Sequence, residues 1–165
     1  MKWMMENVSK VKEASKANKL QFGTVDSWLI WNLTQEKSFV TDVTNASRTM
    51  LMNIKTLNWD EKLCDFFQIN RECLPKILPS ASLYGHIGYE GCPLPSNLPI
   101  SGCLGDQQAA LVGQKCFSAG MAKNTYGTGC FMLYNVGPEV IYSQHGLLST
   151  VAYQFGEDPP VYALE

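Results

Sequence analysis

The chain has 165 residues, of which 45% are hydrophobic and 17% are charged, and its formal net charge is -2. A weakly acidic chain of this composition is typical of a soluble globular protein, and it lacks the positive field that nucleic acid or an anionic membrane requires of a partner. Charged residues occur within the first six positions, and no apolar run approaches the ~18 residues of a membrane span, so we expect neither a signal segment nor membrane insertion.

Three helices are predicted in the first part of the chain. Apolar groups recur on one face of residues 1–19, which predicts an amphipathic helix with a solvated lysine face. A second helix is expected after Gly23, with Thr24 as its N-cap and four apolar residues at helical spacing, Val25, Trp28, Leu29 and Leu33. Asn58 followed by Glu61 resembles a capping box and predicts a third helix, with one apolar face formed by Trp59, Leu63, Phe66 and Phe67.

The rest of the chain changes from loop to helix to strand. Residues 75–99 are rich in Pro, Gly and Ser, which predicts a long surface excursion, and residues 100–105 read as a short buried strand. A helix is expected over 106–117, followed by strands at 122–125, 130–135, 147–153 and 161–164. This order suggests two domains that meet near residues 117–120. The strands have no helix after them to cover an apolar face, which suggests that the sequence is cut from a longer one.

The six cysteines form no C-x-x-C pair, and several lie in apolar stretches. We therefore expect reduced, mostly buried thiols in a cytoplasmic protein rather than a disulfide framework. His86 and His145 are the two histidines and neither lies near a spaced cysteine pair, so no metal site is expected.

Two short segments carry residues suited to phosphate chemistry. Residues 105–110 (GDQQAA) put a carboxylate and two amides at a strand-to-helix junction, where the helix dipole favours anions. Residues 124–131 (NTYGTGCF) put Thr128 between two glycines in a tight turn, where backbone N–H groups can approach a phosphate. Purely structural roles remain open at this point, because Asp106 can serve as an N-cap and the glycines can form a hairpin turn.

Four longer segments carry a resemblance to a known family. They are residues 22–31 (FGTVDSWLIW), 41–51 (TDVTNASRTML), 99–111 (PISGCLGDQQAAL) and 122–131 (AKNTYGTGCF). In their order and spacing they resemble the glycerol kinases of the FGGY carbohydrate kinase family. The regions around Trp59 and Cys103 look closer to animal than to bacterial members. The resemblance covers nearly the whole chain and fades around 90–97 and 137–144.

The resemblance implies an α/β chain with the actin-like, ribonuclease H-like ATPase fold, in which two domains close over ATP, Mg²⁺ and glycerol. Residues 1–117 would be the C-terminal part of the first domain, and residues 118–165 the truncated start of the second. Asp106 would be the catalytic general base and would contact the substrate together with Gln107 and Phe131. Thr128, with Gly127 and Gly129, matches the family's second phosphate-binding turn. A weakly basic carboxylate suffices, since the hydroxyl proton leaves late in phosphoryl transfer.

Other parts of the family's machinery have no counterpart in this sequence. The glycine-rich phosphate hairpin, the Arg-Glu pair and Tyr that bind glycerol, and the adenine pocket are missing, so we expect the isolated chain to be inactive. Residues 90–97 lack the Gly-Gly and Arg that bacterial members use for inhibition by a sugar bisphosphate, which puts that regulation in doubt. A homo-oligomer of the full-length enzyme, and attachment to the outer mitochondrial surface, stay open.

Two alternatives also stay open. The chain is either a piece of a glycerol kinase or a short non-catalytic product that acts as a binding module, for example on a full-length subunit. A related sugar kinase acting on a pentulose shares the fold, but the amino-acid sequence of residues 44–51 and 126–131 favours glycerol.

Overall fold

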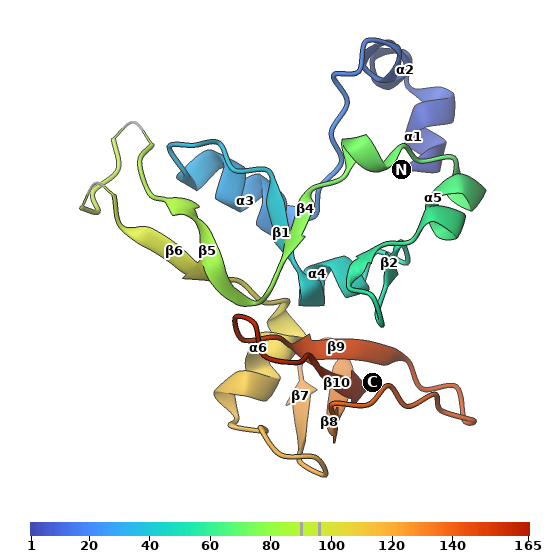
Figure 1. Cartoon of the computed structure of the whole chain (residues 1–165), viewed down its shortest axis with the longest axis vertical. Coiled ribbons are helices and arrows are strands. Elements are labelled where there is room, and N and C mark those ends of the chain that lie inside the picture. Colours follow the sequence, from blue (N-terminus) through green and yellow to red (C-terminus); the bar gives the residue numbers. More distant parts are fainter. Residues whose placement is uncertain (90, 96) are drawn as a thin grey trace.

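The structure is a computed structural model that describes residues 1–89, 91–95 and 97–165. Figure 1 shows residues up to β6 as a spread group of helices and short strand pairs above, and α6 with a compact sheet below. The two groups meet where α4 (Val43–Ser47) lies against β9 (Ser149–Tyr153). Glu90 and Ser96, which belong to the predicted proline-rich excursion, lie outside the described residues.

Helices lie in the predicted regions with shorter bounds, and α4 and a 3₁₀ turn come in addition to those predicted. The helices are α1 (Lys2–Asn7), α2 (Ser9–Lys16), α3 (Val25–Leu33), α4, α5 (Glu61–Phe67), the 3₁₀ turn η1 (Arg71–Cys73) and α6 (Asp106–Gly113). The single helix predicted over residues 1–19 is wrong, because Val8 adopts an extended conformation and divides it into α1 and α2. Thr24 is the N-cap of α3 as predicted.

Two predictions about helix detail are wrong. The side chain of Asp60, not Asn58, caps α5, accepting a hydrogen bond from Leu63 N at 3.1 Å, and Asn58 belongs to a strand. In α3 the side chains that point inward are Ser27 and Ile30, whereas Val25 and Trp28 are 74% and 65% exposed. The apolar residues of α3 surround the helix, so their spacing did not define the buried face.

Within the described parts of the chain, the strands form three two-stranded pairs and one four-stranded sheet. β1 (Val40–Asp42) pairs in parallel with β4 (Lys76–Leu78), and the antiparallel pairs are β2 (Met52–Asn53) with β3 (Asn58–Trp59) and β5 (Ala81–His86) with β6 (Pro99–Gly102). The four-stranded sheet is antiparallel, in the order β7-β8-β10-β9. Its strands are β7 (Ala122–Tyr126), β8 (Cys130–Gly137), β9 and β10 (Val161–Leu164).

The predicted surface excursion over 75–99 is wrong in part. β4 and β5 lie within it, and Tyr84 on β5 is 2% exposed, with its hydroxyl donating to the carbonyl of Pro79 at 2.6 Å. The strand predicted at 100–105 exists as β6, but it is mostly exposed rather than buried. The abundance of Pro and Gly in this stretch predicted loop, whereas the strands within it are short and end in turns.

The sheet predicted to lack a covering helix is covered in part: α6 and α4 pack on opposite faces of β9, whereas Met132 and Tyr134 on β8 are 54% and 43% exposed. Successive residues of a strand point to opposite faces, and on β9 Ala152 packs against Leu111 of α6 while Val151 packs against Val43 of α4. Helices that precede the sheet in sequence therefore cover part of it. A third core cluster, built around Leu51 and Cys64, lies between β2 and α5.

The cysteines are free thiols, but the prediction that most are buried is wrong. Cys64 and Cys116 are buried, Cys130 is exposed, and the other three are intermediate. Over residues 1–89, 91–95 and 97–165, no helix combines the length and apolar character needed to cross a membrane. The domain division near residues 117–120 stays a prediction.

Candidate functional site

Asp106 is the first residue of α6, at the point where the chain leaves β6. The N-cap of the helix is Gly105, and no side chain caps it. Asp106 is exposed, and its carboxylate accepts a hydrogen bond from Nε2 of Gln107 at 3.2 Å. The purely structural interpretation of Asp106 as the N-cap is therefore wrong, and its carboxylate faces solvent beside an amide.

Gln107 leads from Asp106 to a lysine that sequence reasoning passed over. Lys123 on β7 is only 5% exposed, and its ammonium group donates to Oε1 of Gln107, to Oγ1 of Thr125 at 2.9 Å and to the carbonyl of Phe131 at 3.1 Å. Burial lowers the pKa of Lys123, and the negative charges of Glu165 and Asp106 oppose that shift. One cation thus joins Asp106, Gln107 and Phe131 in a continuous group.

The predicted turn between β7 and β8 is present. The N–H of Gly127 donates to the carbonyl of Gly129 at 2.8 Å, and Thr128 at the tip is exposed. A Cβ on Gly129 would lie 3.0 Å from the ring of Phe131, so the absence of a side chain there makes room for the ring. Among the hydrogen bonds of the described residues, none joins Thr128 to Asp106, and the turn adjoins the Asp106 group through Phe131 and Thr125, which both bond to Lys123.

A buried carboxylate lies behind the start of α6. Asp42 is fully buried and accepts hydrogen bonds from the backbone and side chains of Thr44 and Asn45 at 2.8–2.9 Å, and from Oγ of Ser80 at 2.9 Å. Burial raises the pKa of Asp42, while the hydrogen bonds from Asn45 and Thr44 hold it down. Asp42 also caps α4, which explains why residues 41–51 turn from strand to helix there.

Thr44 connects this carboxylate to α6. Its hydroxyl donates to Oδ1 of Asp42 at 2.9 Å and accepts the N–H of Gly105 at 2.7 Å. Because Gly105 is the N-cap of α6, the position of Asp106 depends on a hydrogen-bond chain that begins at a residue more than sixty positions earlier. Asp42 and Thr44 lie inside the segment 41–51 used for the resemblance, but no local pattern in it revealed this connection.

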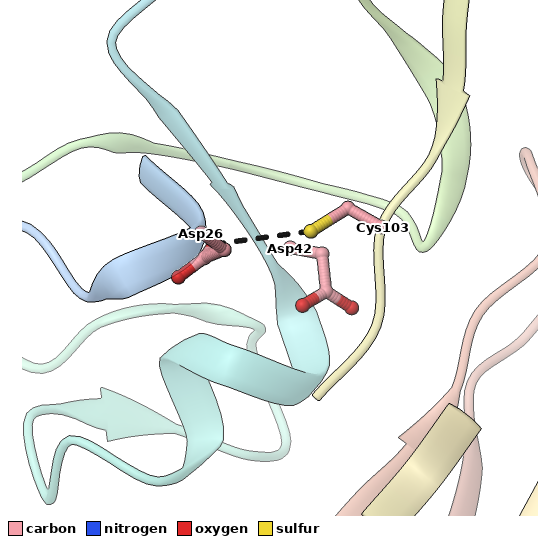
Figure 2. A group of neighbouring side chains, drawn as sticks. All are labelled: Asp26, Asp42 and Cys103. Carbon is pink, nitrogen blue, oxygen red and sulfur yellow. Dashed lines mark hydrogen bonds between the residues drawn. The ribbon is translucent and has the colours of Figure 1, made fainter. Parts of the chain in front are cut away.

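Asp42 also forms a group with Asp26 and Cys103, shown in Figure 2, whose possible metal-ligand atoms lie within 4.8 Å of one another. Both oxygens of Asp26 already accept hydroxyl hydrogen bonds, from Thr24 and, at 2.7 Å, from Thr41. Burial raises the pKa of the Cys103 thiol to about 12, so it keeps its proton. The donors fill the oxygens that a metal ion would need, so the group fits a hydrogen-bonded cluster rather than a metal centre.

The comparison with protein families decides the relationship. The N-terminal domain of the FGGY family of carbohydrate kinases matches residues 1–113. The chain belongs to this family. The resemblance expected from the four sequence segments is thereby confirmed.

Curated relatives of this FGGY chain are named as glycerol kinases. The chain is 56% identical to a probable glycerol kinase of Dictyostelium discoideum and 54% identical to one of Caenorhabditis elegans, with all of this chain and 32% of each relative covered. The chain therefore spans about a third of the length of the curated relatives it matches. Bacterial relatives, such as glycerol kinase 1 of Streptomyces coelicolor at 55%, are about as similar, and they cover the chain equally.

Solved structures agree on the fold. The crystal structure of Plasmodium falciparum glycerol kinase with ADP superposes with a TM-score of 0.93 at 47% identity, covering 99% of this FGGY chain and 32% of that protein. A ligand-bound xylulose kinase from Lactobacillus acidophilus gives 0.79 at 23% identity, with the same coverage. The α/β, actin-like ATPase fold expected for the chain is confirmed, and the chain covers part of it.

Proposed function

We propose that this chain is a segment of an ATP-dependent glycerol kinase and contributes the general base and part of the glycerol site to the full-length enzyme. The observation that carries the proposal is the continuous group of Asp106, Gln107, Lys123 and Phe131, in a chain that is 52–56% identical over its length to proteins named glycerol kinase. Those names favour an enzyme over a non-catalytic interaction module.

Asp106 is suited to the role of general base because its carboxylate is exposed and lies at the N-terminus of α6. In phosphoryl transfer through a loose transition state, catalysis is mostly positioning and electrostatics, and a weakly basic carboxylate can orient a hydroxyl and take its proton late. In the proposed reaction a glycerol hydroxyl attacks the γ-phosphorus of ATP. The bond to ADP breaks, and Asp106 receives the proton.

Gln107 and Phe131 are suited to hold a small polyol. The Gln107 amide carries N–H groups that can donate hydrogen bonds to a hydroxyl oxygen. The Phe131 ring, which is 43% exposed, offers an apolar face to carbon atoms. Their spacing is fixed because Lys123 contacts the side chain of the first and the backbone of the second. The Phe131 ring therefore suits a small substrate with three carbon atoms.

We assign the turn formed by Gly127, Thr128 and Gly129 to the phosphates of ATP. The support is the exposed hydroxyl of Thr128 and the small flanking residues, which leave the backbone N–H groups accessible. Mg²⁺ would accompany ATP and neutralise charge on its phosphates. Asp42 does not fit as a ligand of such an ion, because its oxygens already accept hydrogen bonds from Thr44 and Ser80.

The comparisons favour glycerol over a pentulose. The glycerol kinase neighbour is 47% identical to this chain, whereas the xylulose kinase neighbour is 23% identical and supports the fold alone. A cytoplasmic location is consistent with six free thiols, which a reducing compartment preserves.

The test uses a chimeric enzyme in which residues 1–165 replace the matching segment of the Dictyostelium relative. We expect ATP-dependent phosphorylation of glycerol in preference to xylulose, and we expect Asp106→Asn to lower kcat by roughly a hundredfold or more. Asp65→Asn, the same change at an exposed position on α5, should leave kcat unchanged. The isolated chain should show no turnover. A folded chimera that phosphorylates no glycerol, beside an active parent, would refute the proposal.

A further inference from the structure

Lys123 is a buried cation that uses every hydrogen it has. An ammonium group has three donors and no acceptor, and Lys123 directs them to the side chain of Gln107, the side chain of Thr125 and the backbone carbonyl of Phe131. Burying a charge in this way is unfavourable unless it is paired and fully hydrogen-bonded. The arrangement therefore requires each of the three acceptors to stay in place.

The contact with Lys123 decides which way the amide of Gln107 points. A group that can only donate must face the amide oxygen, so Oε1 of Gln107 turns toward Lys123 and Nε2 turns the other way. On that side Nε2 donates to Oδ2 of Asp106 at 3.2 Å. One N–H of Gln107 thus meets the carboxylate, and the second has no acceptor among the described residues.

We propose that Lys123 is a positioning residue that fixes Gln107 as a hydrogen-bond donor to the substrate, an inference that rests on the proposed kinase function. With its oxygen turned toward Lys123, the amide presents its second N–H to a substrate oxygen. Asp106 beside it is the acceptor. The pair then recognises a hydroxyl group by both of its properties, since the O–H points at Asp106 and the oxygen lone pair receives the N–H of Gln107.

The charges around Lys123 fit this role. Asp106 and Glu165 are carboxylates whose charges act on it, and Glu165 is already paired with Arg48 at 2.7 Å. Lys123 therefore lies close to the Asp106 carboxylate while its three donors go to Gln107, Thr125 and Phe131. Because Lys123 also donates to the carbonyl of Phe131, it fixes the position of Phe131 relative to the Gln107 amide.

The geometric test uses the 165-residue chain and nuclear magnetic resonance of side-chain amides. We compare Lys123→Met, which keeps the length and removes the donors, with Lys62→Met at an exposed position on α5, remote from β7 in Figure 1. In Lys123→Met the Gln107 amide signals should shift and its order parameter should fall, while Lys62→Met leaves both unchanged. Unchanged Gln107 signals in Lys123→Met would overturn the proposal.

The kinetic test uses the same two substitutions in the chimeric enzyme. Losing the orientation of one neutral hydrogen bond should raise KM for glycerol roughly threefold to tenfold, with little change in KM for ATP. A purely structural role would lower the amount of folded enzyme, and hence kcat, without altering KM for glycerol. Lys123→Arg retains donors and should recover part of the lost affinity, and an unaltered KM in Lys123→Met would refute the positioning role.

The double variant with Gln107→Leu separates Lys123 from other contributions. If Lys123 acts through Gln107, removing it in the Gln107→Leu background should produce no further rise in KM, whereas independent effects would multiply. The two proposals fail differently. An inactive chimera, together with shifted Gln107 signals in Lys123→Met, contradicts the kinase function and supports the positioning role of Lys123. An active chimera with unshifted signals supports the kinase function and contradicts the positioning role.

Discussion

Replacing Thr44 by Val should loosen the start of α6 from the rest of the protein. The substitution preserves the branched shape of a residue that is 0% exposed, but it deletes the hydroxyl that donates to Asp42 at 2.9 Å and accepts the N–H of Gly105 at 2.7 Å. The first bond ends on a carboxylate and contributes about 1.5–3 kcal/mol. The N–H of Gly105, left without its acceptor, costs about 1 kcal/mol or more in addition. Allowing for relaxation, we expect a loss of about 2–4 kcal/mol in the free energy of unfolding.

Urea unfolding followed by circular dichroism and tryptophan fluorescence measures this loss. With a slope of about 2 kcal/mol per molar urea, the midpoint of Thr44→Val should fall by about 1–2 M. Thr44→Ser keeps the hydroxyl and removes one methyl group, so its loss should be nearer 1 kcal/mol. Thr56→Val makes the same change at an exposed site and should lie within about 0.5 kcal/mol of the wild type.

The order of the variants decides the outcome. If Thr44→Ser proves more harmful than Thr44→Val, packing of the methyl group matters more than the hydroxyl, and the proposed hydrogen-bond chain from Asp42 to Gly105 contributes little. A Thr44→Val midpoint equal to that of Thr56→Val would refute the reasoning outright.

Two further predictions concern protonation and thiol reactivity. Hydrogen bonds from His86 lower the pKa of Glu36 from 4.5 to about 2, so their contribution to stability is complete above pH 4.5 and is lost as the pH falls toward 2. Acid titration of the unfolding midpoint should therefore be shallower over that range in Glu36→Gln, and an identical profile would contradict the pairing. Because burial raises the pKa of Cys103 to about 12, roughly one thiol in ten thousand is ionised at pH 8, and iodoacetamide should label exposed Cys130 first by peptide mass spectrometry. Equal labelling of both would show that the region around Cys103 opens readily.

The fold was predictable where local chemistry agrees with tertiary packing. The four strands after residue 120 and the helix that begins at Asp106 follow from alternation and turn residues, and the structure has them nearly where expected. Predictions failed where long-range packing prevails. Trp28 sits on an exposed face because Ser27 and Ile30 turn inward, and the Pro- and Gly-rich stretch contains the strand that buries Tyr84.

The site was predictable only in part. Asp106 and Gln107 stand out because they occupy a strand-to-helix junction, whereas Phe131 was indicated by the family resemblance alone. Lys123 gave a weaker signal, since alternation along β7 places it on the inward face with Thr125, where a lysine needs partners. Asp42 and Thr44 gave none, because their partners Ser80 and Gly105 come from segments far along the chain.

The hydroxyl of Ser80, which donates to Asp42 and accepts the backbone N–H of Gln154 at 3.3 Å, has a consequence for synthesis on the ribosome. The chain emerges from its N-terminal end, so the interior around Asp42 stays incomplete until residues more than a hundred positions later have left the exit tunnel. Contacts of such long sequence separation form slowly. During translation we therefore expect the early segments to stay incompletely packed until these later residues emerge, so that folding is completed in a late step.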